Sequence, residues 1–153
     1  MEISSEKPIL VLACGNPSRG DDALGPLLID RLVGEGGLRG IETLADFQLQ
    51  IEHVLDLEWR SRVIFVDAVA AGPEPFAFVP ARPRADASLS THSIRPSALL
   101  GLFRRVAGKE PPSAWVLAIR GYGFELGAPL SDRAAANLDR ALVFLTRLLR
   151  PAP

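Results

Sequence analysis

The sequence has very few of the residues from which small proteins build their commonest sites. Its 153 residues include one cysteine, one methionine, one tyrosine and two histidines. The lone Cys14 excludes a disulfide framework and a zinc site made of several thiolates, and it suits a reducing compartment. No apolar run approaches the length of a membrane span, and the first residues, MEISSEKP, are too polar and acidic for a signal peptide. We therefore expect a cytoplasmic protein with no membrane partner.

The sequence also has no excess of basic over acidic residues. Lysine and arginine total 17 against 18 aspartates and glutamates, and the net charge is −1. No nucleic-acid partner is therefore expected. Apolar residues make up 48% of the chain and charged residues 23%, which is ordinary for a globular protein. The length predicts a single domain over 1–153, and we expect a monomer.

Strand and helix patterns alternate along the chain. Continuous apolar runs predict buried strands at 9–14, 41–45, 62–67 and 115–119, with an edge strand at 76–79 before Pro80. Apolar residues at helical spacing predict helices after Asp22, around 47–55, from Pro96 and after Ser131, which would cap the last one. The pattern indicates an α/β fold: a three-layer α/β/α sandwich with a twisted, mainly parallel five-stranded sheet of the phosphorylase/hydrolase-like type.

The second helix has a predicted inner face. At about 100° per residue, Phe47, Ile51, Val54 and Leu55 share one side, whereas His53 points roughly the opposite way. We therefore expect His53 to face solvent.

Polar side chains gather where the predicted strands end. In a parallel α/β sheet, ligands bind beyond the carboxyl ends of the strands. The stretch VLACGNPSRGDDALG (11–25) places two adjacent acids just after the first strand. The residues predicted to meet at this edge are Asn16, Asp21, Asp22, Asp46, Asp67 and His92.

Two carboxylates and one imidazole could bind a divalent cation such as zinc, nickel, manganese or iron, with a coordination position left open for chemistry. Spacing alone leaves other interpretations open. Asp21 and Asp22 could instead stabilise a helix N-terminus, and His92 could be an exposed loop histidine. No dinucleotide loop, phosphate-binding loop or G-x-S-x-G elbow occurs in the chain. Cys14 is expected to be an inert core residue.

The sequence resembles the hydrogenase maturation proteases along essentially its whole length. The motifs that carry the resemblance are VLACGNPSRGDDALGP, VIFVDAV (63–69), STHS around His92, and WVLAIRGYGFELGAPLS (115–131). The resemblance implies an endopeptidase that removes a C-terminal extension from the large-subunit precursor of a nickel–iron hydrogenase. Asp22, Asp67 and His92 match the family's catalytic metal ligands, which would engage nickel already carried by the substrate. Zinc or cadmium would occupy the same site in vitro.

The chain departs from the family pattern at two places. Ala23 stands where the family usually has glycine, and ADFQLQIEH (45–53) replaces a turn rich in glycine and threonine, although Asp46 keeps the family's acid. These changes bear on substrate choice, with Asn16, Asp21 and Asp46 expected to support the ligands or contact substrate. Two alternatives are a nickel-binding chaperone of the same fold that does not cut, and a peptidyl-tRNA hydrolase, which the net charge disfavours.

Overall fold

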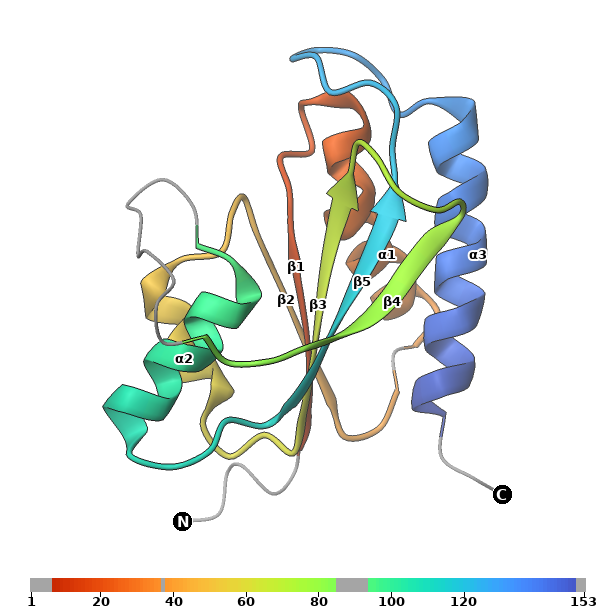
Figure 1. The fold of residues 1–153 in the computed structure, drawn as a ribbon. Coiled ribbons are helices and arrows are strands. Elements are labelled where there is room, and N and C mark those ends of the chain that lie inside the picture. Colours follow the sequence, from red (N-terminus) through yellow and green to blue (C-terminus); the bar gives the residue numbers. More distant parts are fainter. Residues whose placement is uncertain (1–6, 37, 85–93, 151–153) are drawn as a thin grey trace.

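The computed structural model describes residues 7–36, 38–84 and 94–150 (Figure 1). Strands and helices alternate along most of the chain. In order they are β1 (Ile9–Cys14), the 3₁₀ turn η2 (Gly20–Ala23), α1 (Leu24–Gly34), β2 (Ile41–Asp46), the 3₁₀ helix η3 (Ile51–Leu57), β3 (Arg62–Val69), β4 (Phe76–Ala81), α2 (Pro96–Ala107), β5 (Ser113–Arg120) and α3 (Asp132–Leu149).

The five strands form one sheet in the order β2-β1-β3-β5-β4. All neighbours are parallel except β4, which runs antiparallel to β5 at the edge. The edge position explains how Pro80 fits in a strand, since proline has no N–H to donate to a second neighbour. The predicted mainly parallel five-stranded sheet and its edge strand are confirmed.

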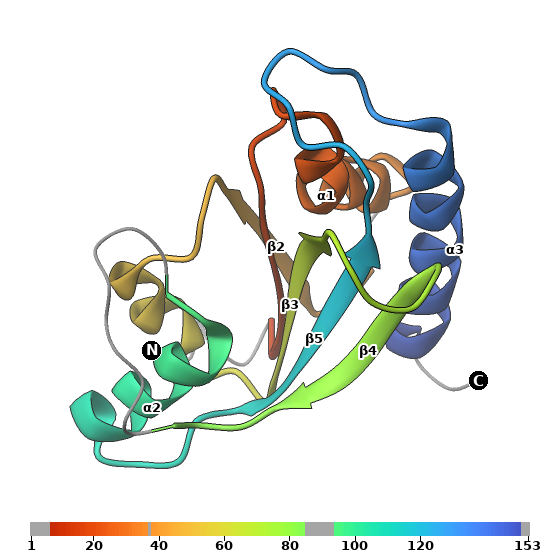
Figure 2. The same cartoon turned by 45° about the horizontal axis from the view of Figure 1, so that its top comes forward.

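Helices cover both faces of this sheet (Figure 2). Alternate residues of β1 enter different cores: Val11 and Ala13 pack with α1 and α3, whereas Leu10 and Leu12 pack with η3 and α2. All four side chains are fully buried, which explains why this strand is continuously apolar instead of alternating with polar residues. The three-layer α/β/α arrangement predicted from the sequence is confirmed.

Two helix starts follow the predicted chemistry. Pro96 is the first residue of α2, where its missing N–H costs nothing. Ser131 caps α3, and its Oγ accepts a hydrogen bond from the Ala134 N–H at 3.2 Å. Within the described ranges, no helix has the length and apolar character needed to cross a membrane.

The predicted phase of the second helix is wrong. This segment is the 3₁₀ helix η3, which turns about 120° per residue instead of 100°, so residues three apart share a face. Val54 and Leu57 lie three apart and are both buried, whereas Leu55 and Ile51, the first residue of η3, are exposed. His53 is only 8% exposed and does not face solvent.

The connections leave a crevice beside β1 and β3. From β1 the chain passes through α1 to β2 on one side, and then returns across β1 to form β3 on the other. Such a reversal of direction separates the loops that follow the two strands and creates the usual ligand site of open α/β sheets. Asp22 follows β1 and Asp67 belongs to β3, so the topology brings both acids to this crevice.

Candidate functional site

A cavity of about 300 Å³ opens at the carboxyl ends of the central strands. Both Asp22 and Asp67 line it, together with Cys14 from the end of β1. Apart from Gly15 and Gln48, the other lining residues are apolar, from the central strands, the loop after β2 and the start of α2: Leu12, Phe47, Leu49, Phe65, Val66, Val69, Ile94, Pro96 and Val116. Two carboxylates thus meet in an otherwise largely apolar pocket.

Asp22 is held in place by the turn that precedes it. The backbone N–H of Asn16 donates to Asp22 Oδ2 at 2.7 Å, while the Asn16 side chain accepts from the Ser18 N–H at 2.9 Å. Gly15 makes this close approach possible, because a Cβ there would lie 2.0 Å from the Asp22 carbonyl oxygen. Asn16 therefore supports Asp22 through its backbone, and its side chain shapes the turn.

Asp67 lies inside β3, two residues before its end at Val69, whereas the sequence predicted that the strand would close on it. Asp67 pairs with Ala118 of β5, whereas the pairing of β3 with β1 stops one residue earlier, at Val66. By strand alternation, the Asp67 side chain lies on the same face as Val63 and Phe65, the face covered by η3 and α2, and it lines the pocket. The Ala68 N–H donates to Asp67 Oδ1 at 2.8 Å.

The pocket changes the proton affinity of Asp67. Its carboxylate retains access to solvent, but desolvation by the pocket walls raises the pKa of Asp67 to about 6, against the opposing effect of the Ala68 N–H. The negative charge of Asp22 raises it further. Both effects disfavour a second negative charge, so the pocket favours the arrival of a proton or a cation.

Replacing Asp67 by asparagine is expected to stabilise the metal-free fold at neutral pH. The folded-state pKa lies above the ordinary 3.8, so the folded protein holds this proton more tightly than the unfolded chain. The wild type therefore gains stability as pH falls from about 6 to about 4, and asparagine cannot share that gain. Urea unfolding at pH 7, 5 and 4 should show an advantage for Asp67→Asn that shrinks with acid. An equal loss of stability at every pH would contradict this.

Cys14 lines the same pocket and is only partly buried, contrary to the prediction of a core thiol. Burial raises the pKa of the Cys14 thiol to about 12, and the charges of Asp67, Asp46 and Asp22 add to the effect. A thiol with this pKa is protonated at neutral pH and is a poor nucleophile. The prediction that Cys14 is chemically inert agrees with these surroundings.

Asp21 lies beside the pocket and is not among its lining residues. It is fully buried and accepts four hydrogen bonds from the loop 121–131: from the backbone N–H groups of Tyr122, Gly123 and Ser131 and from Ser131 Oγ. Burial alone would raise the pKa of Asp21, but the donors from Ser131, Tyr122 and Gly123 together lower it. Its side chain caps no helix directly; it holds Ser131, the cap of α3, and so fastens that loop to η2.

Asp46 contacts His53, the histidine that was predicted from the sequence to face solvent. His53 Nε2 lies 3.3 Å from Asp46 Oδ2, and His53 Nδ1 accepts from the Gln50 N–H at 2.8 Å. The other carboxylate oxygen of Asp46 accepts from the Phe47 N–H at 2.7 Å. This pair therefore fixes both ends of the loop 47–50, which forms one wall of the pocket.

His92, the third predicted ligand, lies outside the described residues, and so do its neighbours 85–93. Within the described part of the chain, no three histidine, cysteine, aspartate or glutamate side chains gather as a metal site. Ile94 and Pro96, which follow His92 closely in the chain, line the pocket. The predicted meeting of His92 with Asp22 and Asp67 stays a prediction.

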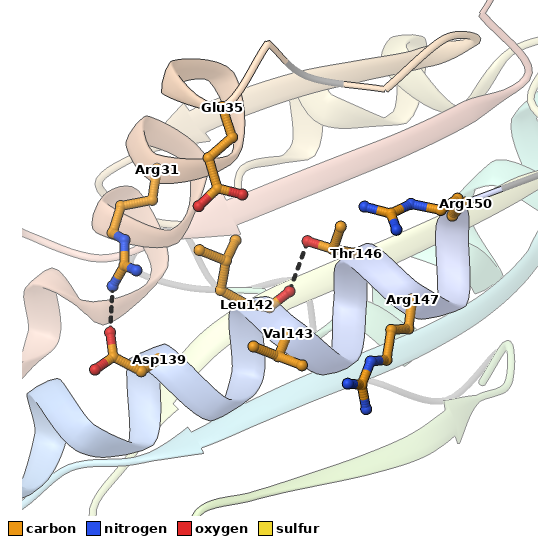
Figure 3. A pocket seen from close by; sticks show the side chains of 8 residues that line it. All are labelled: Arg31, Glu35, Asp139, Leu142, Val143, Thr146, Arg147 and Arg150. Carbon is orange, nitrogen blue, oxygen red and sulfur yellow. Dashed lines mark hydrogen bonds and ion pairs between the residues drawn. The ribbon is translucent and has the colours of Figure 1, made fainter.

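A second cavity of about 280 Å³ lies between α1 and α3 (Figure 3). Three arginines line it with Glu35 and Asp139, and Arg31 pairs with Asp139 at 2.5 Å. Figure 3 shows Glu35 extending from the end of α1 toward α3, whereas Arg147 points away from α1. Since this cavity does not lie at the strand ends, it is a weaker candidate than the pocket around Asp22 and Asp67.

The two pocket carboxylates are suited to a cation. One oxygen of each accepts a backbone N–H, and the other has no hydrogen-bond partner among the described residues. Carboxylate oxygens in a confined pocket are ligands for zinc, manganese and related divalent ions, and a cation would relieve their mutual repulsion. The donor set therefore fits the predicted metal chemistry.

Several solved structures have the same fold. The maturation protease HycI of a nickel–iron hydrogenase, from Thermococcus kodakarensis KOD1, is 21% identical with a TM-score of 0.70, covering 95% of this chain and 94% of that one. The hydrogenase maturating endopeptidase HybD from E. coli is 22% identical with a TM-score of 0.70, covering 92% and 91%. The hydrogenase 2 maturation peptidase from a Thaumarchaeota archaeon is 22% identical with a TM-score of 0.68, covering 94% and 98%.

No protein-family profile and no curated protein sequence matches the chain. The solved structures nevertheless align with almost the whole chain and are themselves covered almost completely. The resemblance inferred from the sequence motifs is thus confirmed where structure can test it. This chain has the fold of the nickel–iron hydrogenase maturation proteases.

Proposed function

We propose that this protein is an endopeptidase that removes the C-terminal extension of a nickel-loaded hydrogenase large-subunit precursor. The observation that carries the proposal is the pair Asp22 and Asp67, which line one pocket at the strand ends. The pair occurs in a fold shared with solved hydrogenase maturation endopeptidases. Asp22, Asp67 and His92 would recognise the nickel that the substrate carries.

The residues around the pocket have separate tasks in this proposal. Asp22 and Asp67 each keep one oxygen for the substrate's nickel, while the backbone N–H groups of Asn16 and Ala68 fix their orientation. The apolar wall lowers the effective dielectric constant beside the two acids and so strengthens their attraction to a cation. Nickel held between substrate and enzyme would position the peptide beside the pocket, so that cleavage depends on prior metal insertion.

The experiment is incubation of the purified protein with nickel-loaded and nickel-free precursor, followed by intact-mass measurement of the large subunit. Loss of a C-terminal peptide only from the nickel-loaded form is the expected result. Stable binding of the loaded precursor without any mass loss would instead identify a nickel-binding chaperone. Equal cleavage of both forms would refute recognition through nickel.

A further inference from the structure

An exposed apolar surface lies next to the pocket, on the segment between β2 and β3. Four large side chains of this segment are exposed: Phe47 by 66%, Ile51 by 40%, Leu55 by 72% and Trp59 by 66%. We call these four residues the 47–59 apolar surface. Phe47 also lines the pocket, so the surface begins at the candidate site itself.

The fold holds these side chains outward. The inner side of η3 is already occupied, because His53, Val54 and Leu57 are buried against the rest of the molecule. The Asp46 and His53 contacts fix the loop that carries Phe47. Trp59 has a backbone φ of 65°, an unfavourable left-handed conformation for a bulky residue, and displays its indole to solvent.

The same segment is acidic. Between β2 and β3, residues 47–61 contain three carboxylates, Glu52, Asp56 and Glu58, and one arginine, Arg60, whose guanidinium pairs with Glu42 of β2. Glu58 is offset by Lys109, which follows the end of α2, at 3.4 Å, and Asp46 lies against His53. Glu52 and Asp56 have no ion-pair partner among the described residues, so two unpaired carboxylates accompany the apolar side chains.

We propose that the 47–59 apolar surface binds the precursor protein. The segment of the precursor that it binds combines apolar side chains with lysine or arginine. This inference rests on the proposed function. Two observations select this occupant: Phe47 belongs both to this surface and to the lining of the pocket, and the unpaired carboxylates Glu52 and Asp56 favour a basic segment. Exposed apolar side chains ringed by polar ones are typical of protein-binding surfaces.

The test compares two changes on this surface with matched changes on α1, which covers the other face of the sheet. Leu55→Ser is paired with Val33→Ser, since Val33 is also exposed, by 55%. Glu52→Lys is paired with Asp30→Lys, which makes the same charge change at another exposed position. The rates of processing are measured with full-length nickel-loaded precursor at several precursor concentrations and two salt concentrations.

We expect Leu55→Ser and Glu52→Lys to raise KM about tenfold, with kcat within about twofold of the wild type, because they weaken docking and leave the pocket intact. Added salt should reduce the effect of Glu52→Lys. The two α1 variants should process normally. Unchanged KM in both surface variants, with a wild type that cleaves, would overturn this inference alone. A wild type that never cleaves or binds the precursor would overturn the proposed function and this inference with it.

Discussion

Replacing Asp22 or Asp67 by alanine is expected to abolish processing of the nickel-loaded precursor while the protein stays folded. Each substitution removes a carboxylate that would bind the substrate's cation, and loss of one partner from a desolvated charge contact lowers the rate by about 100-fold or more. The fold should survive, because the two acids repel each other and neither closes an ion pair with a described residue. Intact-mass measurement of the large subunit follows cleavage, and circular dichroism checks the fold.

The matched control is Asp30→Ala, an exposed carboxylate on α1 outside the pocket. It should process at the wild-type rate and differ in stability by no more than about 0.5 kcal/mol. His92→Ala is expected to behave like the two pocket variants if His92 is the third ligand. Near-normal cleavage by Asp22→Ala or Asp67→Ala would remove that residue from the proposed site.

The architecture was accessible from the sequence because the buried elements follow simple periodicities. Strands β1, β3 and β5 are parallel and covered on both faces, so each is a nearly continuous apolar run. The helix α3 was predicted for the same reason, since its leucines repeat at true α-helical spacing, and Leu138, Leu142 and Leu145 are buried. The phase of η3 was not accessible, because a short apolar segment does not reveal whether it turns by 100° or by 120° per residue.

The candidate site was predictable in part. Loops after parallel strands meet at one edge, so the sequence alone assigns Asp22 and Asp67 to one crevice. The hydrogen-bond partners of Asp21 and the contacts of His53 could not be predicted from the sequence. Asp21 contacts residues more than 100 positions away, and His53 is held by Asp46 and the Gln50 N–H. Contacts of this kind depend on tertiary geometry and leave no periodic signal.

Asp21→Asn is expected to destabilise the fold by roughly 2–4 kcal/mol, because a buried amide cannot accept all four hydrogen bonds that the carboxylate accepts. Its –NH₂ group would face at least one N–H donor, from Ser131 in the most favourable orientation, where Oδ1 accepts a single bond at 2.7 Å. The lost charge would also weaken the bonds from Tyr122 and Gly123. Thermal unfolding at pH 7 should show a melting temperature lower by roughly 10 °C.

The pH dependence separates this cause from a general packing defect. The folded-state pKa of Asp21 lies below 3.8, so its contribution to stability is present above that value and is lost as pH falls below it. The gap between wild type and Asp21→Asn should therefore narrow below about pH 4, whereas a packing defect would persist. Asp30→Asn, at an exposed position, serves as the control and should change stability little at any pH. A variant as stable as the wild type at pH 7 would show that Asp21 does not anchor the loop 121–131.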